Sequence, residues 1–161
     1  MKIKREWRRA DQGVTLVELL VVIVIVGTLA AIAAPNFFVQ RQKGYDADAK
    51  SDLRSMASAQ KTYATDLTAF VTCSGATACK NSSSLGGYGF RASTGVKIAS
   101  VADGTNGFCA VALSQSGRYY LYDSENGGLA TYNSTTAPTK LNDGLSTGAC
   151  TNVSSYPTPA A

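Results

Sequence analysis

Residues 14–34 read VTLVELLVVIVIVGTLAAIAA, an apolar run of 21 residues in which Glu18 is the only charged side chain. As one unbroken helix this run would be about 32 Å long, because an α-helix rises about 1.5 Å per residue. The hydrocarbon core of a bilayer is about 30 Å thick. We therefore interpret residues 14–34 as a membrane-spanning helical segment.

Residues 1–13 form a short basic leader in front of this run. The leader carries five Lys or Arg side chains and two acidic ones, and only Arg41 and Lys43 follow the run closely. Positive charge marks the cytoplasmic side of a membrane helix. The sequence therefore predicts a chain that crosses the cytoplasmic membrane once, with its N-terminus in the cytoplasm and the rest outside.

Two other interpretations of the run are a plain membrane anchor and a secretory signal peptide. Ala31-Ile32-Ala33 offers an A-x-A cleavage pattern, but the run exceeds the roughly 7–15 apolar residues of a signal peptide. A charged Glu within a membrane helix costs about 2.5–3.5 kcal/mol on insertion scales. Glu18 is therefore a candidate functional residue.

The composition argues against several classes of function. The chain has no histidine, which excludes His-based catalysis and His metal ligands. Residues 14–161 carry ten basic and nine acidic side chains, a balance that gives little basis for strong nucleic-acid binding by one subunit. We expect no enzymatic activity, no metal and no cofactor.

Residues 13–20 (GVTLVELL), behind a basic leader, resemble the prepilin cleavage and methylation segment of type IV pilins and type II secretion pseudopilins. The resemblance extends through Gly27 to residues 33–37 (AAPNF). It implies cleavage between Gly13 and Val14 by a prepilin peptidase, followed by N-methylation of Val14, where the family usually has Phe. It also implies a platform protein and an ATPase-driven assembly machine as partners.

Glu18 is the first candidate for an assembly residue. Cleavage would create a cationic α-amine at Val14, one helical turn from the Glu18 carboxylate, and an apolar environment tolerates a charge pair better than either charge alone. In a staggered filament the carboxylate of one subunit would neutralise the amine of its neighbour. Gly27 and Pro35 bracket a weak stretch of the helix. That stretch is either a simple kink or, as the resemblance implies, a place of local unwinding within a filament.

Residues 35–68 continue the helix with one apolar stripe and end it near residues 66–68. The stripe predicts contact with a globular head, and the charges between its members are expected to be solvated or to face other subunits. The stripe consists of Phe38, Tyr45, Ala49, Leu53, Met56, Tyr63 and Leu67, and the charges are Lys43, Asp46, Asp48, Lys50, Asp52, Arg54 and Lys61.

The globular head is assigned to residues 69–161. Residues 69–87 are expected to be a loop, and short runs separated by Gly, Asn or Asp-Gly turns predict strands at 88–93, 96–101, 108–113, 119–123 and 129–132. Four cysteines in an oxidising compartment allow three disulfide connectivities. We favour Cys73–Cys79, which would fasten the loop, and Cys109–Cys150, which would tie the tail to a central strand.

These patterns predict an α+β fold with a long N-terminal helix packed on a small antiparallel sheet, and the resemblance implies that this fold is of the type IV pilin kind. The leading hypothesis is a subunit that is processed, held in the membrane and polymerised into a surface filament for adhesion, motility or uptake. A pseudopilin of a type II secretion system is the alternative within the family. A secreted or membrane-anchored binding domain that never polymerises is the alternative from a different class.

Overall fold

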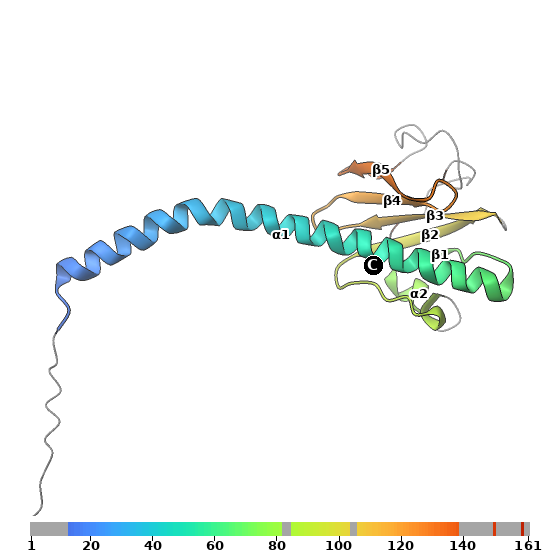
Figure 1. Ribbon diagram of the computed structural model, residues 1–161, viewed down its shortest axis with the longest axis horizontal. Helices are drawn as coiled ribbons and strands as arrows, with labels where there is room; N and C mark the ends of the chain where they lie inside the picture. Colours follow the sequence, from blue (N-terminus) through green and yellow to red (C-terminus); the bar gives the residue numbers. More distant parts are fainter. Residues whose placement is uncertain (1–12, 82–84, 104–105, 139–149, 151–158, 160–161) are drawn as a thin grey trace, which may run out of the picture. The chain divides into compact units, whose positions relative to one another are not determined.

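A computed structural model describes residues 13–81, 85–103, 106–138, 150 and 159 of the chain (Figure 1). The chain divides into two compact units, Met1–Val39 and Gln40–Ala161. The first unit contributes the N-terminal part of helix α1 to the described structure. The second contains the rest of α1 and the sheet.

Helix α1 runs from Leu16 to Leu67 without interruption, which confirms the predicted end near residues 66–68. Val14 and Thr15 precede it. The helix stops at Thr68, whose φ of 53° is left-handed and whose backbone N–H still donates to the Ala64 carbonyl at 2.9 Å. A left-handed residue at this position turns the chain out of the helix.

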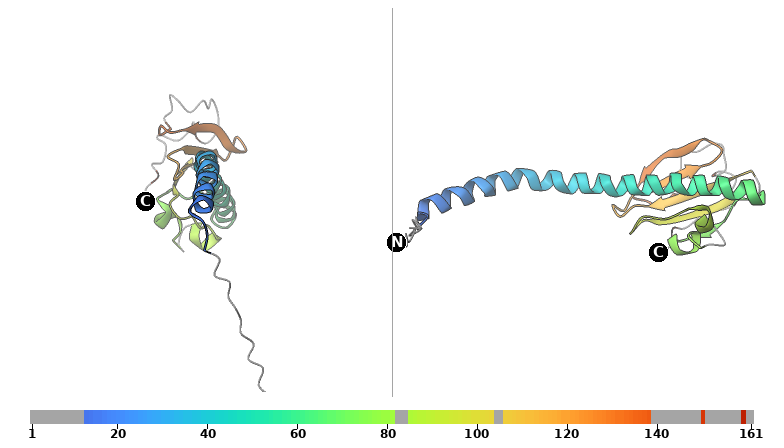
Figure 2. Two further views of the ribbon diagram at one scale, coloured as in Figure 1. Left: turned by 90° about the vertical axis from the view of Figure 1, so that its left-hand side faces the viewer. Right: turned by 60° about the horizontal axis from the view of Figure 1, so that its bottom comes forward.

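The sheet has five antiparallel strands in the order β1-β2-β3-β4-β5 (Figures 1 and 2). Each strand pairs with its neighbour in sequence, so the sheet is a simple meander. The strands are β1 (Cys73–Ser74), β2 (Lys97–Asp103), β3 (Gly107–Leu113), β4 (Tyr119–Asp123) and β5 (Gly128–Ser134). The strand predictions at 96–101, 108–113, 119–123 and 129–132 are confirmed.

The core lies between α1 and one face of the sheet. Leu53 and Met56 of α1 are fully buried in the same cluster as Phe108 and Ala110 of β3. The alternate β3 residues Cys109 and Val111 belong to a second buried cluster. Because successive side chains of a strand point to opposite faces, β3 is buried on both faces and is the central strand of the fold.

Two local predictions are wrong. Residues 88–93 are not a strand: the 3-10 helix η1 (Leu85–Tyr88) leads into irregular chain, because Gly89 takes a φ of 87° and Asp52 of α1 binds the backbone at Ser93. Residues 69–87 are not simply a loop, since they also contain β1 and the short helix α2 (Ala76–Cys79). Elements of two to four residues are too short to leave a periodic pattern.

The apolar stripe of α1 is also shorter than predicted. Its buried part begins at Ala49, with Tyr45 and Tyr63 half-buried at its margins. Phe38 and Leu67 are 62% and 54% exposed, so both lie outside the core.

Candidate processing and assembly site

Thr15 and Glu18 form a capping box at the N-terminus of α1. The Glu18 backbone N–H donates to the Thr15 hydroxyl at 3.2 Å, and the Thr15 backbone N–H donates to the Glu18 carboxylate at 2.9 Å. The Thr15 hydroxyl also donates to that carboxylate at 3.0 Å. The reciprocal bonds satisfy amide groups that a helix end otherwise leaves unpaired. The role of Thr15 was not predicted from the sequence, although the pattern Thr-x-x-Glu at residues 15–18 signals such a box.

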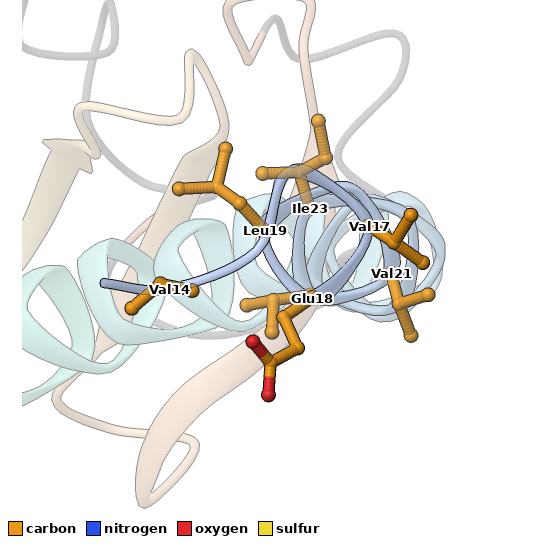
Figure 3. A pocket seen from close by; sticks show the side chains of 7 residues that line it. Val14, Val17, Glu18, Leu19, Val21 and Ile23 are labelled. Carbon is orange, nitrogen blue, oxygen red and sulfur yellow. The ribbon is translucent and has the colours of Figure 1, made fainter. Parts of the chain in front are cut away.

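Apolar side chains lie beside Glu18 at the start of α1. Figure 3 shows the carboxylate projecting from the helix, with Val14 before it in the chain and Val17 and Val21 on neighbouring turns. These three valines are 72%, 67% and 47% exposed, respectively. The start of α1 is therefore an uncovered apolar surface that carries a single negative charge.

The predicted cleavage site lies just outside the helix. Gly13 and Val14 are exposed and belong to no helix or strand, and a Cβ built on Gly13 would meet nothing within 4 Å. A protease needs an accessible, extended backbone at its cutting site. An α-amine at Val14 would lie one residue before the Thr15 N-cap, close in sequence to the carboxylate that Thr15 already holds.

Gly27 and Pro35 do not break the helix. Proline lacks the N–H that would bond the carbonyl four residues earlier, yet α1 continues through it. Nearby side chains bond to the backbone instead: the Thr28 hydroxyl donates to the Ile25 carbonyl at 2.8 Å, and the Asn36 amide donates to the Ile32 carbonyl at 3.4 Å. Space is open around a Cβ built at Gly27, so no contact with the described residues requires glycine there.

The N-terminal part of α1 is long and apolar enough to cross a membrane, and none of its most apolar window is buried within the chain. In water, such a large exposed apolar surface would be unfavourable. The surface therefore requires an apolar environment, either lipid or other protein chains.

Two disulfides join the four cysteines of the head. Cys73 bonds Cys79 and Cys109 bonds Cys150, with Cα–Cα distances of 5.2 and 4.7 Å. This is the connectivity favoured from the sequence among the three possible ones. The backbone N–H of Cys150 also donates to the buried Asp123 carboxylate at 2.9 Å, which fixes Cys150 against the end of β4.

Asp52 corrects the expectation that the charges of α1 are solvated or face other subunits. Its side chain is only 4% exposed, and its carboxylate accepts hydrogen bonds from the backbone and the hydroxyl of Ser93. Burial raises the pKa of Asp52 above the usual aspartate value, and repulsion from Asp48 adds to the effect of burial. Asp52 therefore links α1 through hydrogen bonds to the segment that leads into β2.

Gln60 makes a second set of buried hydrogen bonds to α1's neighbouring chain, which was not predicted from the sequence. The fully buried Gln60 amide donates to the Val71 carbonyl at 2.7 Å and accepts from the Val71 N–H at 2.8 Å, as a neighbouring strand would. It also donates to the Ser100 hydroxyl at 3.0 Å.

In the described part of the chain, no group of three or more His, Cys, Asp or Glu side chains is arranged to hold a metal ion.

The exposed apolar helix, the capping box at its start and the disulfide-bonded α+β head together define a pilin-like class of protein. Residues 8–34 match the family model described as the prokaryotic N-terminal methylation motif. Over this N-terminal segment the chain is similar to type IV pilins and type II secretion pseudopilins.

Individual relatives agree with this assignment. The chain is 38% identical over 63 residues to the type IV major pilin protein PilA of Myxococcus xanthus, a match that covers 39% of this chain and 28% of PilA. It is 37% identical over 59 residues to the type II secretion system core protein G of Pseudomonas aeruginosa, covering 37% of this chain and 42% of the relative. The corresponding protein of Pectobacterium carotovorum is 42% identical over 56 residues, covering 35% and 36% of the two chains. The chain thus spans less than half the length of each of these relatives.

Proposed function

We propose that this protein is the precursor of a structural subunit that polymerises into a type IV pilus-like filament. The observation that carries the proposal is the exposed apolar start of α1, which bears one carboxylate next to an accessible cleavage motif. Burying a Val, Leu or Ile side chain contributes about 1.5–3 kcal/mol against water. An apolar helix can gain this energy first in the bilayer and then from copies of itself.

In this proposal residues 1–13 are a leader that a prepilin peptidase removes, and the new N-terminus at Val14 is methylated. Residues 14–34 hold the precursor in the cytoplasmic membrane, with the leader in the cytoplasm. Residues 35–68 continue the helix into the head at residues 69–161. A platform protein and an ATPase-driven machine then move subunits into a surface filament, and the protein itself has no catalytic role.

Glu18 is proposed to set the position of each incoming subunit. In an apolar filament core, its carboxylate would pair with the α-amine at Val14 of a neighbouring subunit. Such buried pairs favour specificity more than net stability, because desolvation offsets most of the attraction. Gly27 and Pro35 are proposed to permit local unwinding of the helix during assembly, since each weakens a continuous helix.

Two measurements test the proposal together. Mass spectrometry of the mature chain should find an N-terminus at Val14 carrying one methyl group. Glu18→Ala should insert into the membrane as the wild type does and form almost no filaments in electron micrographs of sheared surface material. Glu125→Ala, at an exposed carboxylate in the β4–β5 turn, is the matched control and should assemble normally.

The outcomes separate the competing interpretations. An N-terminus at Ala34 would identify a secreted domain, and one at Met1 would identify a plain membrane anchor. Normal filaments from Glu18→Ala would exclude the role given to Glu18.

A secretion pseudopilus is the second candidate, and the similarity to type II secretion system core protein G favours it. Deleting the gene separates the two roles. Loss of protein export with no change in surface filaments would assign the chain to a pseudopilus, and the reverse result would assign it to a pilus.

A further inference from the structure

A cationic groove lies between α1 and the β4–β5 hairpin, within the unit of residues 40–161. Its volume is about 290 Å³, and Lys50 and Arg54 of α1 face Tyr120, Tyr132 and Asn133 of the two strands across it. The groove is remote in sequence from the capping box and has no part in the function proposed for Glu18.

Among the residues that the structure describes, the two cations of the groove have no acidic partner. Lys50 and Arg54 lie one helical turn apart, a spacing at which like charges repel each other. The Lys50 ammonium lies 4.8 Å from the centroid of the Tyr120 ring, and neither cation forms an ion pair within the described residues. Asp46, one turn before Lys50, instead accepts hydrogen bonds from Ser116 and Tyr120.

The opposite edge of the same helix segment carries the complementary charge. Asp48 precedes Lys50 by two residues, so it lies about 200° around the helix axis from Lys50. Asp48 is exposed, and it has no ion pair or hydrogen bond of its side chain among the described residues. One turn further along is Asp52, a buried group of the same charge that Asp48 repels. Each edge of α1 therefore bears a charge that nothing in this part of the chain neutralises.

We propose that the groove binds Asp48 of a second copy of this chain, so that Asp48 of one subunit pairs with Arg54 and Lys50 of the next. This proposal rests on the proposed function, because it assigns a contact between neighbouring filament subunits. Asp48 and the groove lie on different edges of one molecule, so the contact joins two different surfaces. Such a heterologous contact extends into a filament instead of closing into a dimer.

The contact also predicts a spacing. Six residues separate Asp48 from Arg54, so two parallel helices bring them together when they are offset by about 9 Å along the axis. Tyr120 and Tyr132 form apolar walls that would shield the pair from water and strengthen it. The Arg118 guanidinium donates to the Asn133 side-chain oxygen at 3.2 Å, which leaves the Asn133 amide group to donate to an incoming carboxylate.

Reciprocal charge reversal in the full-length chain, expressed in its own cells, tests the proposal. Arg54→Glu and Asp48→Lys should each lower the yield of sheared filaments about tenfold, because each places like charges opposite one another. The double variant D48K/R54E should recover most of the wild-type yield, since it restores an ion pair of reversed sense. Lys97→Glu, at an exposed cation at the start of β2, is the matched control and should not change the yield.

A second measurement does not depend on charge. The double variant D48C/R54C should give disulfide-linked ladders in sheared filaments, whereas either single cysteine variant should give none. Membrane levels and protease resistance identify any variant that fails to fold. If a charge-reversal variant fails to fold, the neutral variant Arg54→Gln or Asp48→Asn is used in its place, and a smaller loss of filaments is expected.

Each remaining outcome overturns a specific statement. Normal filaments from both reversals, or no ladder from D48C/R54C, would exclude this contact and leave the proposed function standing. Loss of filaments in R54E without recovery in D48K/R54E would also exclude the contact. That result would assign the groove to another anionic partner, such as a lipid headgroup or nucleic acid. If the wild type forms no filament at all, the proposed function fails and this contact fails with it.

Discussion

Both carboxylate oxygens of Asp52 are bound by Ser93, a residue 41 positions later in the chain. The Ser93 backbone N–H donates to Oδ2 at 2.7 Å, and the Ser93 hydroxyl donates to Oδ1 at 2.8 Å. Hydrogen bonds to a charged acceptor are stronger than neutral ones. This pair holds α1 against the irregular chain before β2. The burial of Asp52 determines how the pair responds to pH.

Asp52 should make the stability of the head depend on pH. Its pKa in the folded chain is raised above the ordinary value of 3.8, chiefly by burial. The folded state therefore binds a proton more readily than the unfolded state does. As pH falls through the raised pKa, Asp52 should add to stability, and this contribution should be complete below the ordinary value.

Asp52→Asn should remove this dependence. Thermal unfolding of the full-length chain in detergent, followed by near-ultraviolet circular dichroism at a series of acidic pH values, measures it as the difference between wild type and variant. Glu125→Gln, at an exposed carboxylate, should leave the wild-type profile unchanged. A difference between wild type and Asp52→Asn that is constant with pH would contradict the prediction.

Gln60→Leu should destabilise the head by about 2 kcal/mol, because it removes the acceptor of the Val71 N–H and leaves that donor without its partner. The Val71 carbonyl keeps the Ser100 hydroxyl, which donates to it at 2.9 Å, so only part of the arrangement is lost. Chemical denaturation in detergent provides the measurement. Gln42→Leu, at an exposed position of the same helix, should change stability by less than about 0.5 kcal/mol. Equal effects of the two variants would show that the Gln60 bonds contribute nothing.

The parts of this fold that were predictable from sequence are those with a local pattern. The apolar run and the amphipathic stripe predict α1, and the short apolar and aromatic runs around Val111 and Leu121, bounded by turn residues, predict the central strands. The GVTLVELL segment predicts a processing and assembly site on Gly13, Val14 and Glu18 because its residue types are contiguous. These features require no knowledge of which distant segments meet.

The rest depends on contacts between distant segments. In the sequence, Asp52 has the pattern of a surface charge, and only its contact with Ser93 shows that it is buried. Gln60 likewise has the pattern of an exposed polar residue, and only its pairing with Val71 shows otherwise. The groove of Lys50 and Arg54 forms only when β4 and β5 pack beside α1. Tertiary packing overrides local preference at each of these positions, and a single sequence contains no signal of it.

Thr15→Ala should loosen the first turn of α1 without preventing membrane insertion. Replacing an N-cap Thr by Ala costs about 1 kcal/mol, which corresponds to roughly fivefold faster local opening. Hydrogen exchange of the Glu18 amide in the purified precursor should therefore be roughly fivefold faster, because that amide donates to the Thr15 hydroxyl. Thr15→Ser should retain the cap. Thr28→Ala, which removes a hydroxyl bonded to a mid-helix carbonyl, should leave exchange at Glu18 unchanged.

The two disulfides should contribute unequally to the stability of the head. In the chain-entropy account, a crosslink stabilises by restricting the unfolded chain, and the effect grows with the length of the closed loop. Cys109–Cys150 spans 41 positions and Cys73–Cys79 only 6. The model gives about 4 kcal/mol for the longer loop and about 2 kcal/mol for the shorter one. The pairwise variants C109A/C150A and C73A/C79A, compared by denaturation of the full-length chain under non-reducing conditions, measure the difference. A larger loss from C73A/C79A would mean that native contacts of the connector, and not loop entropy, determine what these crosslinks contribute.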